Sequence, residues 1–514
     1  MEKVKKRYGL WTGIAMVIGI VIGSGVFIKA GDVLKYCGGD LKLSLLAWLI
    51  GGIIMVSSGF CFAVFAGKIT KYNGVVDYVE AATNDKTGYV LAWIMTVFYY
   101  PVIVSIISLM AGSYFFEMIG LDYSINSWQN FLFAFALVTI LVAINYFSPV
   151  ISAKFQISAT VIKLIPILVI AIAGLFASLI AGEEYGVINA IKTPAEGYVK
   201  NFGDAVRKTA FAYEGWVCAT AINAELKESE KNLSRALVGG TLAILGIYLL
   251  YYISISAVLG NAETINSGNF APVKAFEVLF GKAGGVIFTL FITISCIGTA
   301  NGVTISCCRG AYTMACRGQG IMPEKISKLG KHGEMSPLSC LIGYIVIVFM
   351  LAIWFLALNG VWIFPHLSAM DEILCAVVYA IYISMYVCIM LKFKDLGVFK
   401  RFIMPAVAIC GSLYFVACGT GIYQFIAEKT TSSLIDFTVF IGFLAILTLP
   451  CVFFYKKDEL PAESCDPELG FACATESEVT ENDFTEGEVS ESEGAENGDG
   501  SAEQKSAANA EKIE

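Results

Sequence analysis

The sequence predicts an all-α integral membrane protein with twelve transmembrane helices, and three observations lead to this prediction. The 514-residue chain is 57% hydrophobic and 15% charged, whereas soluble domains average roughly 45–50% apolar and about 25% charged residues. Apolar runs long enough to cross a bilayer recur along the chain. Lys and Arg gather in alternate connections between these runs, as they do on the cytoplasmic side of a membrane.

The expected spans follow one another at short intervals. They lie near residues 10–36, 43–67, 89–118, 128–148, 155–181, 203–224, 233–260, 282–308, 337–358, 366–391, 401–426 and 432–455. If the N-terminus is inside, the inner connections hold about 22 Lys and Arg and the outer ones about 10. We therefore expect a multi-pass protein of the cell membrane, surrounded by lipid, with residues 1–9 and the C-terminal segment in the cytoplasm.

The first span, GIAMVIGIVIGSGVFIKA, contains glycines at its centre, around Gly23, Ser24 and Gly25. Glycine costs about 1 kcal/mol relative to alanine inside a helix, so a helix that only had to span would not concentrate it there. In hydrocarbon, opened backbone is tolerated where it lines a cavity or is buried in protein. These residues indicate either a break between two half-helices or close helix–helix packing, since small residues also mark such interfaces.

The sixth span carries an ionisable residue, Glu214, within FAYEGW and beside Gly215. A carboxylate at bilayer depth costs roughly 2.5 kcal/mol or more and is a functional candidate by default; the alternative is a structural Glu that faces a polar cavity. The first and sixth spans are thus both interrupted near their middle. Paired interruptions in corresponding halves of a chain indicate the binding site of a secondary transporter. If spans 1–5 and 6–10 are inverted repeats, the two breaks meet near the midplane.

Three motifs carry a resemblance to a known family. They are GIVIGSGVF in the first span, FAYEGW with AELKESEKNLSRA in and after the sixth, and GTANGVTISCCRGAYTMACRGQGIMP in and after the eighth. Over roughly residues 8–455 the chain resembles the amino acid–polyamine–organocation superfamily, and within it the L-type group that includes bacterial serine/threonine exchangers. The resemblance implies a LeuT-type fold of 5+5 inverted repeats plus two helices. The repeats would be residues 10–181 and 203–391, followed by helices 11 and 12 at 401–455.

The resemblance also implies a substrate site at the two breaks. Backbone N–H groups that begin a half-helix around Ser24, Gly25 and Val26 suit an α-carboxylate, and carbonyls near Ile20 and Phe211–Tyr213 suit an α-ammonium. Phe211 resembles the family's aromatic gate. Glu214 stands where many L-type members have Gly, and it can hold an ammonium or a cationic side chain, or take a proton. The expected substrate-binding residues are Ile20, Gly23, Ser24, Gly25, Val26, Phe211, Ala212, Tyr213, Glu214 and Gly215.

Two further polar residues lie inside spans. Lys163, in ISATVIKLIPIL, resembles a lysine of the fifth span whose ammonium takes the place of the sodium ion of coupled relatives. It can move a proton or act as a fixed tether; the alternative is a lysine that snorkels to the interface. Asn301 in the eighth span is a candidate for the pocket or for helix packing.

The acidity of the chain belongs to its C-terminal segment. Residues 456–514 hold 18 Asp and Glu against 4 Lys and Arg, a net charge of −14, and the remainder carries +6. With few aromatic residues this segment is expected to be disordered, either as a solvated tail or as a regulatory docking arm. The fifteen Cys form no CxxC or His/Cys ligand spacing, so no metal, cofactor or catalytic residue is expected.

These observations predict a secondary active transporter that works by alternating access. We expect a sodium-independent exchanger or proton-coupled carrier of small neutral L-amino acids, with no nucleic-acid partner and an unknown protein partner. The alternatives are a cationic amino acid or polyamine antiporter, motivated by Glu214, and a non-transporting amino-acid sensor on the same fold. A membrane redox enzyme would need several intramembrane His, and the chain has two His in total. A channel fits two broken helices less well than an occluded site does.

Overall fold

The computed structural model describes residues 9–455, except 24, 70–73, 181–185, 199, 219, 221–225, 331–334, 428 and 430. Throughout this part of the chain the regular elements are helices, apart from an isolated bridge between Cys37 and Lys200. The predicted all-α class is therefore confirmed. Ser24 and the acidic segment 456–514, whose disorder was predicted, lie outside the described residues.

Ten helices in the described ranges are long and apolar enough to cross a membrane. They are α4 (Leu41–Ala66), α6 (Asp85–Ile94) continuing through the π-helical η1 (Met95–Tyr99) into α7 (Tyr100–Met118), α8 (Trp128–Phe147), α9 (Pro149–Ile180), α12 (Ser229–Leu259), α14 (Ala271–Ala315), α16 (Pro337–Leu358), α17 (Met370–Lys392), η5 (Phe399–Ile403) continuing into α18 (Met404–Gly419), and α20 (Ser432–Phe453). This is a multi-pass membrane protein.

The first predicted span adds an eleventh crossing if its pieces are counted together. They are α1 (Leu10–Val21), α2 (Gly25–Ile28) and α3 (Ala30–Tyr36). The sixth predicted span is represented by α11 (Phe202–Ala212), and part of the chain after it lies outside the described residues. The count of twelve spans therefore stays a prediction.

Several long helices begin where the sequence supplies a cap. Asp40 accepts hydrogen bonds from the backbone N–H groups of Lys42 and Leu43 at the start of α4, and Ser127 caps α8 in the same way. Ser336 caps α16, whose first residue is Pro337. Such side chains satisfy N–H groups that the first turn leaves unpaired. They also explain why these helices begin close to the predicted boundaries.

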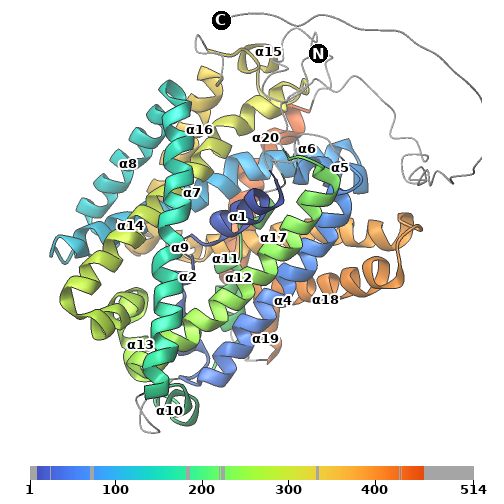
Figure 1. Ribbon diagram of the computed structural model, residues 1–514. Helices are drawn as coiled ribbons and strands as arrows, with labels where there is room; N and C mark the ends of the chain where they lie inside the picture. The colour runs from blue at the N-terminus through green and yellow to red at the C-terminus, as the bar shows by residue number, and fades with distance from the viewer. Residues whose placement is uncertain are drawn as a thin grey trace, which may run out of the picture.

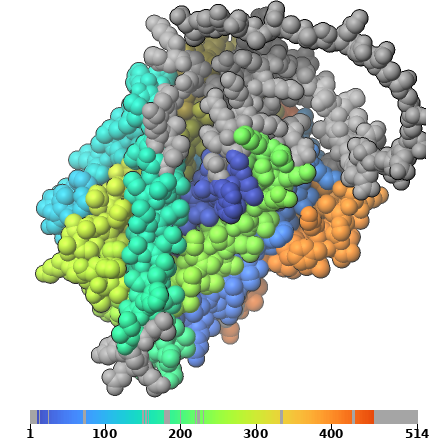
Figure 2. Space-filling model, viewed as in Figure 1, coloured from blue at the N-terminus to red at the C-terminus, as the bar shows by residue number. Residues whose placement is uncertain are grey.

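Short helices lie at the two ends of the bundle (Figure 1). α15 (Pro323–Ile326) lies at one end, while α10 (Val187–Lys192) and α13 (Asn261–Ser267) lie at the opposite end. The remaining short elements are α5 (Val75–Ala82), η3 (Gly268–Phe270), η4 (Phe364–Leu367) and α19 (Ile422–Ala427). Figure 2 shows α9 running along one face beside α1 and α12. The residues of α2 and most of those of α11 are buried inside the bundle, whereas part of α1 lies on the face that Figure 2 shows, where Trp11 is exposed.

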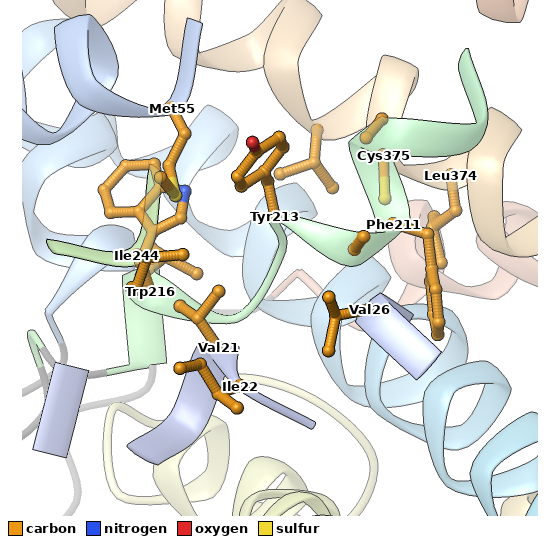
Figure 3. Packing of buried hydrophobic residues seen from close by; sticks show 14 of the residues in the cluster. Val21, Ile22, Val26, Met55, Phe211, Tyr213, Trp216, Ile244, Leu374 and Cys375 are labelled. Atoms are coloured by element: carbon orange, nitrogen blue, oxygen red, sulfur yellow. The ribbon is translucent and has the colours of Figure 1, made fainter. Parts of the chain in front are cut away.

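An aromatic core surrounds these segments. Trp48 on α4 packs edge-on against Tyr213 and Tyr248, with ring centres 5.6 and 5.9 Å away, and Tyr213 stacks on Tyr248 at 5.1 Å. Figure 3 shows Val21, Ile22 and Val26 of the first predicted span close to Phe211 and Tyr213 of the sixth. The centre of the bundle is therefore rigidly packed on one side of the two interrupted helices.

Candidate functional site

The first interruption lies between α1 and α2. α1 ends at Val21, Ile22 has a non-helical ψ of 83°, and the N–H of Gly23 turns back to the carbonyl of Val21 at 2.7 Å. Helix resumes at Gly25. Beyond it the chain bends again, and the segments Gly13–Ile28 and Ala30–Tyr36 meet at 57°. The glycines of this stretch therefore accompany an opened backbone, and Ser24 lies outside the described residues.

The second interruption follows α11. That helix ends at Ala212, and the turn Tyr213–Gly215 follows, with the N–H of Glu214 donating to the carbonyl of Phe211 at 3.2 Å. Gly215 has a φ of +102°, which L side chains rarely adopt. Glycine at this position lets the chain leave the helical path directly after Glu214.

The two interruptions touch each other. A Cβ atom on Gly25 would lie 2.7 Å from the Cα atom of Ala212, a separation that real Cβ atoms do not show. A Cβ on Gly215 would lie 3.5 Å from the carbonyl oxygen of Ile20. The absence of a side chain at Gly25 therefore allows the backbones of the first and sixth predicted spans to meet.

Tyr248 on α12 links the ends of the two half-helices. Its hydroxyl lies 3.2 Å from the carbonyl oxygen of Val21 and 3.0 Å from that of Ala212, which are the last residues of α1 and α11. The last carbonyls of a helix lack intrahelical donors. The single hydroxyl proton of this buried phenol is thus shared between the two helix ends, and the shorter contact is to Ala212.

Glu214 is buried beside these ends, with 6% of its surface exposed. Tyr99 donates a hydrogen bond of 2.7 Å to Glu214 Oε1, while Oε2 has no hydrogen-bond partner among the described residues. Tyr99 is the last residue of the π-helical turn η1, two positions before Pro101. Pro101 has no N–H to donate, and π-bulges of this kind frequently occur at functional sites.

A cavity of about 40 Å³ lies where these groups converge. Its described lining is Ile20, Val21, Gly23, Gly25, Tyr99, Tyr100, Ile103, Ile107, Phe211, Glu214, Gly215, Cys218, Thr299 and Val303. By this measure a site needs about 10–15 Å³ to hold one water molecule, so the cavity has room for a few waters.

Six of the predicted substrate-binding residues line this cavity, and three others lie just behind it. Val26, Ala212 and Tyr213 are buried in the adjoining core, and the hydroxyl of Tyr213 donates to the carbonyl of Trp48 at 2.9 Å. The third and eighth predicted spans contribute lining residues that the sequence reasoning missed, above all Tyr99 and Thr299.

Lys163 is deeply buried on α9, with 1% of its surface exposed. It does not line the cavity within the described residues, and it lies near the thiol of Cys296 on α14. One turn before it, Thr160 occupies the space that a side chain on Gly19 would need. Lys163 is therefore placed between the first and eighth predicted spans, in the bundle interior.

Asn301 belongs to a polar cluster that joins three helices. Its side-chain oxygen accepts a hydrogen bond of 2.9 Å from Asn145 on α8, and its nitrogen donates to Ser152 Oγ on α9 at 3.0 Å. Asn301 is not among the described residues that line the cavity. Of its two predicted roles, the geometry favours helix packing.

A buried set of charges, which the sequence reasoning also missed, adjoins the cavity. Glu372 on α17 lies 2.7 Å from Lys29, 2.9 Å from Lys208 and 3.4 Å from Arg207. Asp371 pairs with Lys29, and Asp204 pairs with Arg207. We call these six residues the charged cluster. The Lys29 ammonium lies 5.3 Å from the centre of the Phe211 ring, so the charged cluster covers one side of the predicted gate.

Comparison with known proteins assigns a class to this arrangement. Residues 8–448 match the sequence profile of a family described as "Amino acid permease". The serine/threonine exchanger SteT of Bacillus subtilis (strain 168) is 30% identical over 418 residues, which cover 80% of this chain and 90% of that protein. The human cystine/glutamate transporter is 26% identical over 330 residues, covering 64% of each chain. The human b(0,+)-type amino acid transporter 1 is 26% identical over 309 residues, covering 60% of this chain and 62% of that protein.

Proposed function

Because this chain belongs to the amino acid permease family of the amino acid–polyamine–organocation superfamily, we propose that it moves small neutral L-amino acids across the cell membrane by alternating access. Its relatives are transporters, and it is not an enzyme. The observation that carries the proposal is the meeting of two interrupted helices at a cavity, with Gly25 against Ala212. Half-helix ends of this kind bind the charged ends of substrates in secondary transporters.

The packing of the helices supports a LeuT-type fold with 5+5 inverted repeats and discontinuous helices 1 and 6. Counting the predicted spans in order, the second packs along the seventh (α4 and α12), the third along the eighth (α7 and α14), and the fourth along the ninth (α8 and α16). An offset of five is what a two-fold relation between residues 10–181 and 203–391 produces. We assign α18 and α20, within 401–455, to the two helices outside the repeats.

The substrate is a zwitterion in this proposal. Its carboxylate meets the N–H groups that begin α2, at Gly25 and Val26, where the positive end of the helix dipole favours an anion. Its ammonium meets carbonyls at Ile20 and around Phe211. The predicted site residue Ser24 lies outside the described residues. Binding at both ends of the zwitterion leaves Glu214 available for a further contact.

Lys163 takes the place of a coupling cation in this proposal, so transport does not require sodium. Its burial between α1 and α14 supports this role over snorkelling to the interface. The basic connections predict that both termini are cytoplasmic. The mode is exchange or proton coupling, and the acidic segment 456–514 lies outside the transport unit.

Glu214 also supports a second candidate function. A buried carboxylate beside the cavity also suits the second amine of a cationic amino acid or a polyamine, and an antiporter of such substrates is the alternative. A sensor that binds amino acids without moving them would share the same site. The two alternatives differ from our proposal in substrate and in flux.

Uptake into proteoliposomes tests the proposed function. Labelled serine, alanine, leucine, arginine and putrescine are offered with and without the same compound inside, and with choline in place of sodium. We expect accumulation of small neutral amino acids, unaffected by choline. Dominant uptake of arginine or putrescine would establish the alternative, and saturable binding without flux would establish a sensor.

A further inference from the structure

Three sulfur-containing side chains meet where α14 packs against the start of α16. Cys308, Met335 and Cys340 are the buried members of one small cluster, each at most 5% exposed. The Cys340 thiol donates a hydrogen bond to Met335 Sδ across 3.7 Å, and the thiols of Cys308 and Cys340 are hydrogen-bonded to each other. We call these three residues the sulfur cluster. Its two halves are far apart in the sequence, so no ligand spacing along the chain could have indicated it.

Hydrogen bonds fix both of the segments that carry the sulfur cluster. Ser339 Oγ donates to the carbonyl of Cys308 at 2.5 Å and accepts from the N–H of Tyr312 at 3.0 Å, which joins α16 to α14. The carbonyl of Met335 accepts from the N–H of Gly330 at 2.9 Å. The three sulfur atoms are therefore presented by a packed helix crossing, and such support is what a preorganised set of ligands needs.

The spacing of the sulfur atoms suits a single metal ion. Two sulfur atoms that each bind one ion at about 2.3 Å lie about 3.8 Å apart in tetrahedral geometry and about 4.0 Å apart in trigonal geometry. The Cys340 and Met335 sulfurs, at 3.7 Å, are close to the tetrahedral value. Thiolate and thioether ligands suit soft cations, Cu(I) among them. The other described residues of the cluster supply no carboxylate or imidazole; they are Val142, Tyr146 and Ile305.

The charge near the sulfur cluster favours a monovalent ion over a divalent one. The guanidinium of Arg309 interacts electrostatically with the thiols of both Cys308 and Cys340. Two thiolates with one Cu(I) leave a single negative charge, which this guanidinium balances. A divalent ion would already neutralise both thiolates, and Arg309 would then add an uncompensated positive charge to a buried site, which is costly.

We propose that the sulfur cluster binds one Cu(I) ion, with Cys308 and Cys340 as thiolate ligands and the Met335 thioether as the third. Binding releases the two thiol protons to the solvent. The basic connection after α14 is predicted to face the cytoplasm, where thiols stay reduced and so remain available as ligands. None of the three residues is among the described residues that line the central cavity, so the site is separate from the proposed transport function.

A bound ion would join α14 to α16 only in the folded protein. A ligand that binds the native state and not the unfolded chain stabilises the native state by mass action. We therefore expect Cu(I) to raise the unfolding temperature of the wild-type protein. This effect separates the proposed site from exposed thiols, since Cu(I) bound to those does not connect two helices.

Competition with the Cu(I) chelator bicinchoninate tests the site on the purified full chain, without oxygen and with ascorbate as reductant. We expect the wild-type protein to take one more Cu(I) from the chelator than Cys308→Ser or Cys340→Ser does. Met335→Leu should hold that ion at least tenfold more weakly, because the third ligand is lost. The thermal stabilisation by Cu(I) should disappear in both serine variants.

Cys307→Ser is the matched control, since Cys307 is the neighbouring buried cysteine and packs in a different cluster. It should keep both the ion and the stabilisation. Equal uptake of Cu(I) by all variants would assign the ion to other thiols and overturn the inference. If the serine variants do not fold, the wild type decides, because an unfolding temperature that Cu(I) leaves unchanged also overturns it, as does tighter binding of Zn(II) than of Cu(I). These measurements do not involve transport, so they stand whether or not the proposed function fails.

Discussion

Replacing Tyr248 by Phe removes the hydroxyl that joins the two interrupted helices and keeps the ring in its stack on Tyr213. The hydroxyl serves the carbonyls of Val21 and Ala212 at 3.2 and 3.0 Å. Leaving a buried acceptor without its donor costs about 1–3 kcal/mol. We expect the variant to unfold at a lower temperature. We also expect it to bind its substrate about tenfold more weakly, since about 1.4 kcal/mol corresponds to that factor.

A matched control lies one helical turn further along α12. The hydroxyl of Tyr251 is buried and has no hydrogen-bond partner among the described residues, so Tyr251→Phe removes a phenol oxygen without breaking a bond. Both variants are purified in detergent, and their thermal unfolding and the substrate concentration that half-saturates stabilisation are measured. If the two variants match in both quantities, Tyr248 does not hold the helix ends together and our reasoning is wrong.

Three other predictions concern separate parts of the molecule. Gly25→Ala should weaken substrate binding at least tenfold, because the new methyl group would lie 2.7 Å from the Cα of Ala212. The protein should still insert into the membrane. Gly25→Leu should abolish binding. Gly246→Ala on α12, where nothing lies within 4 Å, is its control, and unchanged affinity in Gly25→Leu would move the site elsewhere. Lys163→Ala should slow uptake at least tenfold, and wild-type uptake should persist in choline; a sodium requirement would show that the lysine does not replace a cation. Truncation after Lys457 should preserve flux per inserted molecule, and an inserted but inactive product would show that the acidic segment takes part in transport.

Most helix positions could be predicted because hydrocarbon imposes a strong constraint on sequence. A span needs about twenty apolar residues with all backbone groups bonded internally. Predicted spans at 43–67 and 128–148 correspond to α4 (Leu41–Ala66) and α8 (Trp128–Phe147). Gly25 and Glu214 were also recognisable locally, since a glycine cluster and a carboxylate are both costly within an apolar run. The sequence does not indicate as clearly which face of each helix is buried in the protein and which is exposed.

The partners of these residues could not be predicted, because they depend on tertiary packing. Tyr99 lies 115 residues from Glu214 in the sequence, and Lys29 lies 343 residues from Glu372. Pro101 does give a local signal, since a proline inside an apolar span opens the hydrogen-bond ladder before it, and this would have drawn attention to Tyr99. Lys29 gives little signal, because it follows the glycine cluster near the end of its apolar run, where a snorkelling lysine is unremarkable.

The charged cluster has a consequence for how the membrane potential acts on this protein. Its three cations, Lys29, Arg207 and Lys208, balance its three anions, Asp204, Asp371 and Glu372. Moving one unbalanced elementary charge across the membrane changes its free energy by about 2.3 kcal/mol for every 100 mV of membrane potential. When all six groups are ionised and move together, the cluster has no net charge for the field to act on. A movement that carries the six groups together then gains or loses no energy from the membrane potential through this cluster.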